Sequence, residues 1–520
     1  MRILAVGKTP YGTYVTDTAT GEVHPLADLP KLIVQGEGGV LAGVHLYTYV
    51  AALHSRFQDF PSWTLQIRGR ERLLRRQDRK VTVGSFLPLY FGFSSSGRHA
   101  GNYKGVHRSR AKARLFHCMD LEDIAGLKTV PDMDTVLTHA QSILDLCVKR
   151  GVKFTGSRGG IAARLLKASP HWERGRRAAP EFINEIARDK LPGNYYGLAE
   201  GVKGRKIAKA VYLDQVASHH SIAERIDIPH PEHLHARGHY KAALKGQHPA
   251  WLVGSAMRDF LATNHGLVAA YVTVPNVRAE RHLLPPILST PGRRLVFFYT
   301  NELPYFDTMP LARIEHLVAA WTAPIADPAI KEYASFALQE RNAAPGRKAL
   351  LLAAYGALAQ RTDRKSTIYY KYRDKGQPAY LPGAGRVREV QRERRPNTPQ
   401  PSIVNVIARG MIEAETRIRS LDYARELRSY GVEVPSVYVD GLIVVGDLPL
   451  PRPGWSVEAE LTNVVFRHPS TWTSDQLSKE PGIPKPDTNG QKAARMMKAA
   501  AGCDRVKRTN RPPKGPDRRL

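Results

Sequence analysis

The sequence predicts an α+β protein of several domains. The chain has 520 residues, which is enough for roughly two to four domains of about 150 residues each. Its hydrophobic fraction of 42% and charged fraction of 24% are those of an ordinary globular protein. Segments with a helical spacing of apolar residues are mixed with short apolar segments typical of strands. These observations exclude a disordered chain and favour a mixed fold.

Elements of both kinds can be assigned along the N-terminal part of the chain. A hairpin is predicted around Thr20 and Gly21, and residues 81–93 contain strand-like apolar stretches. A helix is predicted over 133–151, because its apolar residues recur at a helical spacing and Gly151 is suited to end it.

The C-terminal half continues the mixture. Helices are predicted over 311–321 and 402–431, and strands over 209–214, 293–300 and 435–446. At least two of these strands carry a lone Asp at or near an apolar stretch. Because Asp is a poor strand former, its presence there calls for an explanation.

The charge of the chain indicates a polyanionic partner. There are 77 Lys and Arg against 48 Asp and Glu, a formal net charge of +29. A single basic stretch is often a solvated surface, but this chain has four, and together they favour contact with nucleic acid phosphates. The stretches are residues 68–80, 98–114, 386–395 and a tail from 492 to 519.

Other features bear on location and redox chemistry. We find no run of about 18 apolar residues and no signal peptide, so we expect a cytoplasmic protein with no membrane partner. Cys118, Cys147 and Cys503 are widely separated, which excludes a disulfide framework and a cysteine-based zinc site.

Two carboxylates carry the main chemical signal. Asp214 follows the apolar stretch KAVYL, and Asp440 precedes GLIVVG. On neighbouring strands such a pair can hold two divalent cations for phosphoryl transfer, although each Asp alone can equally be a strand-end residue. Between them, Lys348 and Tyr355 are seven residues apart on a predicted helix, hence on one face, where they could contact an incoming nucleotide.

These segments resemble the three polymerase motifs of family B DNA polymerases, and they are most similar to the protein-primed branch of phages and plasmids. Residues 214–221 (DQVASHHS) keep the Asp and terminal Ser of DxxSLYPS, which is motif A of the family. Residues 348–356 (KALLLAAYG) resemble KxxxNSxYG, with Leu352 and Ala353 in place of Asn-Ser. Residues 438–441 (YVDG) keep one Asp of DTDS.

The resemblance implies a right-hand polymerase with palm, fingers and thumb, preceded by a degenerate ribonuclease-H-like exonuclease domain. The implied divisions are an exonuclease-like domain at 1–170, a linker with a YxG-like motif at 171–208, palm with a priming-protein insertion at 209–347, a fingers helix at 348–372, a second insertion at 373–402, palm at 403–468, and a short thumb with a basic tail at 469–520.

The resemblance also implies a set of site residues. Asp214, Asp440 and the backbone carbonyl of Gln215 would hold two Mg²⁺ or Mn²⁺ ions. The nucleotide-binding residues would be His219, Lys348 and Tyr355, assisted by Arg341 and Arg347 by position alone. The residues expected to contact DNA are Tyr195, Tyr196, Gly197, Arg386, Arg388, Arg392, Arg394, Arg395, Thr471 and Trp472. The expected partners are primer–template DNA, dNTPs and a terminal priming protein.

The sequence departs from the family in its first 130 residues. Leu46 and Val50 lie where the second exonuclease motif needs Asn and Asp, and no DxE occurs in the opening strand, although Asp134 of the third motif is kept. Because uncharged side chains cannot hold the metals, we expect no proofreading. His219 also replaces the motif A Tyr, which predicts either weaker exclusion of ribonucleotides or a repacked ring that still blocks them.

Two functions therefore remain open. The first is a template-directed DNA polymerase of a phage or mobile element. The second is a catalytically degenerate polymerase-like protein that binds nucleic acid or a priming protein, which the loss of Asn-Ser at 352–353 favours. The survival of Asp214, Asp440, Lys348 and Tyr355 favours the enzyme.

Overall fold

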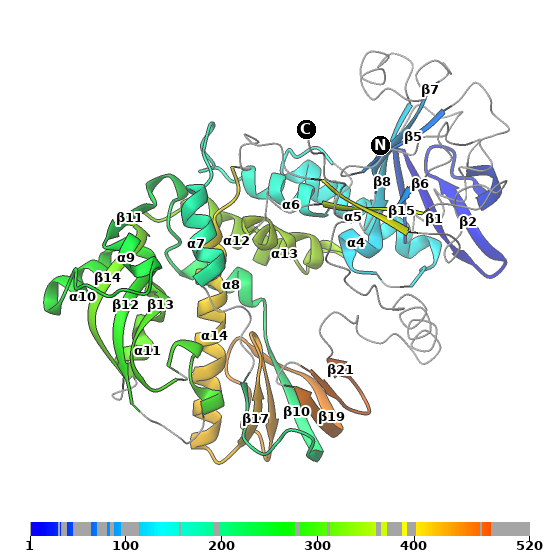
Figure 1. Ribbon diagram of the computed structural model, residues 1–520. Coiled ribbons are helices and arrows are strands. Elements are labelled where there is room, and N and C mark those ends of the chain that lie inside the picture. Colours follow the sequence, from blue (N-terminus) through cyan, green and yellow to red (C-terminus); the bar gives the residue numbers. More distant parts are fainter. Residues whose placement is uncertain are drawn as a thin grey trace, which may run out of the picture.

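The computed structural model of the chain (Figure 1) places an N-terminal sheet at one end, two further sheets at the other end, and helices between them. It describes residues 2–29, 32, 39–44, 64–69, 81–83, 88–94, 114–127, 129–154, 158–190, 197–275, 281–288, 290–308, 312–359, 366–371, 387–392, 402–468 and 471–479. No helix in these ranges has a stretch long and apolar enough to cross a membrane.

The N-terminal sheet has seven strands in the order β3-β2-β1-β4-β8-β7-β5. In chain order these are β1 (Ile3–Thr9), β2 (Gly12–Asp17), β3 (Val23–Pro25), β4 (Gly39–Gly43), β5 (Thr64–Gly69), β7 (Pro88–Ser94) and β8 (Arg114–Asp120). Strand β1 is antiparallel to β2 and parallel to β4, and β4 is parallel to β8. The predicted hairpin around Gly21 is confirmed, because β2 and β3 are antiparallel.

Helix α5 (Met133–Lys149) confirms the helix predicted over 133–151. It begins at Asp132, whose carboxylate accepts the backbone N–H of Thr135 at 2.7 Å and so satisfies a free donor of the first turn. Arg150 caps the C-terminal end, and Gly151 follows in the left-handed conformation at φ +62°, a geometry that glycine adopts without strain. Short helix α4 (Leu121–Ala125) precedes it.

The C-terminal sheet also has seven strands, in the order β21-β20-β19-β10-β18-β17-β9. They are β9 (Gly197–Leu198), β10 (Lys206–Gln215), β17 (Glu433–Val437), β18 (Gly441–Val445), β19 (Trp455–His468), β20 (Thr471–Thr473) and β21 (Ser478–Lys479). The strand predicted over 209–214 is part of β10. The segment 435–446 forms most of an antiparallel hairpin of β17 and β18.

A four-stranded sheet in the order β11-β14-β12-β13 is formed by residues 235–323, which follow β10 in the sequence. Its strands are β11 (His235–Gly238), β12 (His265–Val274), β13 (Gly292–Tyr299) and β14 (Arg313–Ala323), with helices α9 (Tyr240–Leu244), α10 (Gly254–Thr263) and α11 (Leu303–Thr308). Strand β13 confirms the strand predicted over 293–300. The helix predicted over 311–321 is wrong, because this segment is β14, which pairs with both β11 and β12.

Helices fill the middle of the molecule. They are α6 (Arg158–Lys167), α7 (Glu181–Lys190), α8 (Ser218–Arg225), α12 (Pro328–Glu340), α13 (Arg347–Leu358) and α14 (Val406–Ser429). Helix α14 confirms most of the helix predicted over 402–431 and begins later, where the Asn405 side chain accepts the N–H of Ala408. It runs between the four-stranded sheet and the C-terminal sheet (Figure 1).

One hydrophobic core connects the two ends. Its buried residues come from β1 and β4, from α5 and α6, from the four-stranded sheet, and from helices α8, α12, α13 and α14. A separate three-stranded sheet joins β6 (Val81–Val83), β15 (Ser366–Lys371) and β16 (Val387–Arg392), so segments far apart in the sequence pair through their backbones.

Candidate active site

Strands β10 and β18 bring the two predicted acids side by side. In their antiparallel pairing Asp214 lies opposite Gly441, the residue that follows Asp440. The turn between β17 and β18 closes where the N–H of Tyr438 donates to the carbonyl of Gly441 at 2.7 Å, and the N–H of Gln215 donates to the Asp440 carbonyl at 2.8 Å. Both Asp side chains are partly exposed. The juxtaposition predicted from the sequence is therefore present.

Tyr212 lies beside this pair. Its hydroxyl is 3.4 Å from Oδ1 of Asp214, and its ring covers Gly441 so closely that a Cβ at 441 would lie 2.7 Å from it. Burial raises the pKa of Tyr212, and the charges of Asp214 and Asp440 raise it further. Both carboxylates therefore act on one hydroxyl, which stays protonated and polar at the centre of the site.

Glu458 is a third carboxylate that the sequence did not reveal. It is exposed on β19, and its charge also raises the pKa of Tyr212. The pairing of β10 with β19 shifts register between Tyr212 and Leu213, a bulge that places Glu458 there as the extra residue. Because strand alternation does not predict where a bulge occurs, the sequence offered no signal for this residue.

The site offers oxygen ligands of the kind that Mg²⁺ and Mn²⁺ prefer. Among the residues that the structure describes, no cluster of three or more His, Cys, Asp or Glu side chains could hold a metal. The side chain of Gln215 donates to the carbonyl of Thr416 at 2.9 Å and to Ser420 Oγ at 2.7 Å, so only its backbone remains for the site. Two carboxylates and one carbonyl fit ions that keep further waters or phosphate ligands.

His219 and Tyr355 meet across the interface of α8 and α13. Their ring centroids are 5.9 Å apart, and the His220 ring lies 5.2 Å from Tyr355 at 81°. The structure thus brings together residues from the segments 214–221 and 348–356, which resemble two of the three polymerase motifs. Tyr355 is only 1% exposed, however, because His219, His220 and Tyr333 surround it. The predicted contact of Tyr355 with an incoming nucleotide is therefore wrong for this conformation.

Both histidines are neutral. Burial lowers the pKa of His219 to about 3, with smaller contributions from the positive charges of Arg409 and His220. Burial also lowers the pKa of His220 to about 4, with a smaller contribution from Arg341. His219 therefore presents an uncharged ring beside Tyr355.

The predicted cations of the nucleotide site divide into three cases. Lys348 is exposed in the first turn of α13, where no described element covers it. Arg341 is half-buried, and the charge of Asp214 raises its pKa against the larger lowering effect of burial, which places the guanidinium near the acid. Arg347 is a wrong prediction, because it is buried and bonded to Glu340 and to Ser142 Oγ at 3.1 Å.

The predicted DNA contacts are placed only in part. Trp472 is a wrong prediction, because it is 1% exposed and packs 6.0 Å from the Tyr212 ring. Gly197 lies in β9 and Thr471 in β20, where both remain predictions. Arg388 and Arg392 belong to β16, of which the backbone alone is described. Tyr195, Tyr196, Arg386, Arg394 and Arg395 lie outside the described residues, as do Leu46 and Val50.

Comparison with known proteins supplies the fold family. No protein-family model and no curated protein matches the sequence. Among solved structures, phi29 DNA polymerase complexed with primer–template DNA matches with a TM-score of 0.57 at 10% identity, covering 95% of this chain and 93% of that one. The same polymerase with primer–template DNA and incoming nucleotides gives 0.53, at 10% identity and 95% and 94% coverage. The chain has the fold of phi29 DNA polymerase.

The resemblance to the protein-primed phage branch of family B is thus confirmed at the level of the fold. The likeness to phi29 DNA polymerase in complex with single-stranded DNA is similar, with a TM-score of 0.54 and 10% identity over 94% of this chain and 90% of that one. Because so little sequence is shared, the chemistry must be argued from the residues of this chain.

Proposed function

We propose that this protein is a template-directed DNA polymerase, which adds dNTPs to a 3′ hydroxyl in the replication of a phage or mobile element. The observation that carries the proposal is the pairing of Asp214 with Gly441, which brings Asp214 of β10 beside Asp440, the residue before β18. The order of these residues, together with Lys348 between them, matches the three polymerase motifs on a chain with a polymerase fold.

Each residue has a role in this mechanism. Asp214, Asp440 and the Gln215 carbonyl would hold two Mg²⁺ or Mn²⁺ ions, which would activate the attacking oxygen and neutralise the leaving pyrophosphate. Tyr212 orients Asp214 through its hydroxyl, which is 3.4 Å away. Lys348 is free to bind the triphosphate, and Arg341 adds positive charge near Asp214. His219 lies where the sugar of the nucleotide would pack.

The proposed division of the chain follows the sheets. The N-terminal sheet with α5 would be the exonuclease-like domain, and the C-terminal sheet would be the palm. The four-stranded sheet would be the priming-protein insertion, and α13 would be the fingers helix. The helix predicted over 348–372 is too long, because α13 ends at Leu358 and Ser366–Lys371 form strand β15, which pairs with β16. DNA and dNTPs are the proposed partners, and a terminal priming protein is a further one.

Loss of proofreading is part of the proposal. Strand β1 reads ILAVGKT and contains no acid. The N–H of Lys8 donates to the Pro131 carbonyl at 2.9 Å, and a Cβ at Gly7 would lie 2.8 Å from Met133 Cα. The beginning of α5, which carries Asp134, therefore packs directly against the backbone of β1. An exonuclease would need a pocket for metal ions at this place.

Replacement of the two acids tests the polymerase. We expect Asp214→Ala and Asp440→Ala each to slow primer extension by about a thousandfold, because each removes a metal ligand and the several kcal/mol that metal binding contributes. DNA binding should change little. The matched control is Asp447→Ala, an exposed acid shortly after β18. Wild-type extension by either site variant would refute the assignment.

A 3′-labelled primer tests proofreading. Incubated with the protein and Mg²⁺ or Mn²⁺ but without nucleotides, it should stay full length. Shortening that Asp134→Ala abolishes would contradict the proposal.

The second candidate is a polymerase-like protein that binds DNA without chemistry. The burial of Tyr355 and the exposure of Leu352, in place of the motif's Asn, favour it. The extension assay decides between the two candidates. If the second is right, the wild-type protein binds primer–template but extends it no faster than Asp214→Ala does.

A further inference from the structure

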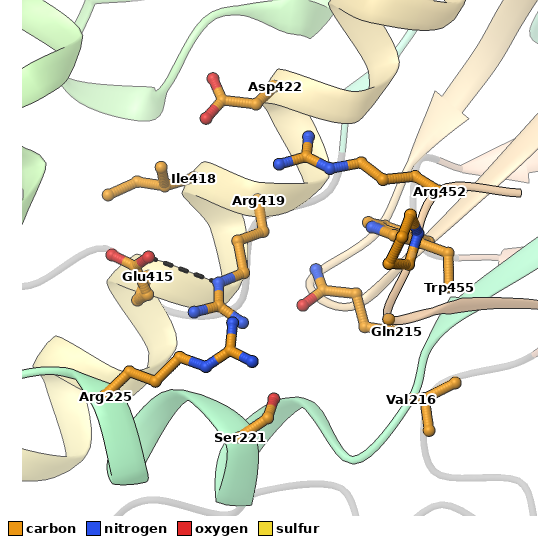
Figure 2. Close-up of a pocket in the computed structure, with 12 residues that line it drawn as sticks. Gln215, Val216, Ser221, Arg225, Glu415, Ile418, Arg419, Asp422, Arg452 and Trp455 are labelled. Atoms are coloured by element: carbon orange, nitrogen blue, oxygen red, sulfur yellow. Dashed lines mark hydrogen bonds and ion pairs between the residues drawn. The ribbon is translucent and has the colours of Figure 1, made fainter.

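A hollow of about 440 Å³ lies beside the catalytic strand but outside the site described above. It is bounded by the end of β10, by α8 and α14, and by residues 452–455 (Figure 2). Gln215 lines it and is bonded to α14. Because alternate residues of a strand point to opposite faces, the preceding Asp214 faces away from the hollow.

Helix α8 separates the hollow from the proposed nucleotide site. Ser221 and Arg225 are four residues apart and line the hollow together. His220 packs instead against Tyr355 of α13. A ligand in the hollow would therefore contact α8 on the side away from the nucleotide.

Two cations converge in this hollow. Figure 2 shows the guanidinium groups of Arg225 and Arg419 turned toward one another. Arg419 contacts Glu415 at 3.4 Å through Nε alone, and Arg225 makes no ion pair or hydrogen bond with a described residue. A third guanidinium, that of Arg452, also lines the hollow, but it is paired with Glu426 at 3.4 Å.

The carboxylates of the lining compensate only part of this charge. Glu415 pairs with Arg419, and Asp422 pairs with Arg425 at 2.6 Å, a residue that does not line the hollow. Arg225 is exposed, so solvent screens part of the repulsion between it and Arg419, but like charges that meet without an anion still repel. The arrangement of Arg225 and Arg419 is therefore one that an anion would stabilise.

We propose that the hollow is a polyphosphate-binding site, which takes free pyrophosphate or the triphosphate group of a nucleotide. Guanidinium groups bind phosphate oxygens in pairs, and two or three of them can hold successive phosphates. The volume lies within the range of small-molecule sites, about 300 to 1,000 Å³, which favours a small ligand over a DNA strand. The proposal does not depend on polymerase activity.

Equilibrium binding of radiolabelled pyrophosphate to the full chain tests this site. The buffer contains EDTA and no DNA, so that metal-dependent binding at Asp214 and Asp440 does not contribute. We expect Arg225→Gln and Arg419→Gln each to weaken binding about tenfold, the loss expected for one charge-assisted hydrogen bond. The control is Arg258→Gln, which removes an exposed Arg from α10 and should bind like the wild type. Lys348→Gln reports any binding at the proposed nucleotide site.

Two competitors distinguish the sources of the phosphate. If dATP binds at least tenfold more tightly than pyrophosphate and Arg225→Gln weakens both, the site takes nucleotides, whereas equal affinities assign it to pyrophosphate. Wild-type affinity of Arg225→Gln for pyrophosphate would overturn the proposal. Two other results would also overturn it. The first is that Lys348→Gln alone loses pyrophosphate binding. The second is that Arg225→Gln weakens the binding of a single-stranded oligonucleotide but not that of pyrophosphate. Equal circular dichroism of all variants establishes that each is folded.

Discussion

His219 is half-buried, and it is also a proposed nucleotide-binding residue. Its pKa is lowered to about 3 in the folded protein, while an unfolded chain protonates His near pH 6.5. Between these values the unfolded state binds more protons, so stability rises with pH and falls on acidification. We expect acidification from pH 7 to 5 to cost the wild type about 2 kcal/mol more than His219→Phe.

Urea unfolding at several pH values measures this difference. His235→Gln, a change at an exposed histidine of β11, is the control and should keep the pH dependence of the wild type. Parallel pH curves for His219→Phe and the wild type would contradict the burial of a neutral ring.

We also propose that His219 influences the choice of sugar. The His219 ring lies 5.9 Å from that of Tyr355, and imidazole is smaller than the phenol that family motif A carries at this position. We expect His219→Tyr to lower ribonucleotide incorporation relative to dNTPs by about ten- to a hundredfold, in the range that steric fit supplies. Single-nucleotide extension with matched dNTP and rNTP measures it. An unchanged ratio would mean that the repacked His219 already excludes the 2′-hydroxyl.

At the residue scale, the sequence was a better guide to which residues pair in the candidate site than to which neighbours bury a side chain. Asp214 and Asp440 could be paired, because each follows or precedes an apolar strand and the motif order restricts the pairing. Arg347 and Trp472 failed, because residue type does not reveal that Glu340 pairs with the first or that Tyr212 packs on the second. Tyr212 is distant from Trp472 in the sequence, as Ser142 is from Arg347, while Glu340 meets Arg347 only through the turn between α12 and α13.

At the element scale, the wrong prediction of a helix over 311–321 has a clear cause. Strand β14 has seven consecutive buried residues, from Leu317 to Ala323, so it lacks the alternation that marks a half-exposed strand. A short apolar run of this kind fits a buried helix equally well by periodicity. The central place of β14 between β11 and β12 decides the conformation, and strand order cannot be deduced from the segment itself.

Two helical glycines give a matched prediction at this scale. A Cβ at Gly410 of α14 would lie 1.3 Å from the Tyr299 hydroxyl, whereas a Cβ at Gly356 of α13 would meet nothing within 4 Å. We expect Gly410→Ala to destabilise the protein by about 1 to 3 kcal/mol or more through overpacking. Gly356→Ala should stabilise it by up to about 1 kcal/mol through helix propensity. Thermal unfolding compares them, and shifts of the same sign would contradict this packing.

At the scale of the whole molecule, the N-terminal region and the helical middle form one structure. Their buried side chains belong to a single hydrophobic cluster. Lys149 and Arg347 both bind Glu340, and Arg347 also binds Ser142, so ion pairs link α5 to α12 and α13. Removing residues 1–150 should therefore destabilise the proposed fingers as well, because α13 would lose its contacts with α4 and α5, including the hydrogen bond from Arg347 to Ser142, and would keep only those with the rest of the chain, such as α6.

Circular dichroism and gel filtration of this truncated chain check the expectation. A soluble fragment that unfolds cooperatively and extends a primer would contradict it, and would make the N-terminal region a separable domain.

The net charge of +29 acts at the same scale. Residues 492–520 carry ten Lys and Arg against two Asp, while the proposed catalytic residues lie elsewhere in the chain. Each phosphate contact adds about 0.9 to the slope of log affinity against log salt. Removing this tail should therefore lower that slope and shorten the products made in one binding event, while the rate of single-nucleotide addition stays close to wild type. Fluorescence anisotropy across a salt series and extension with a trap measure the two effects. An unchanged slope would mean that the positive charge that holds DNA lies in the folded sheets and helices rather than in the tail.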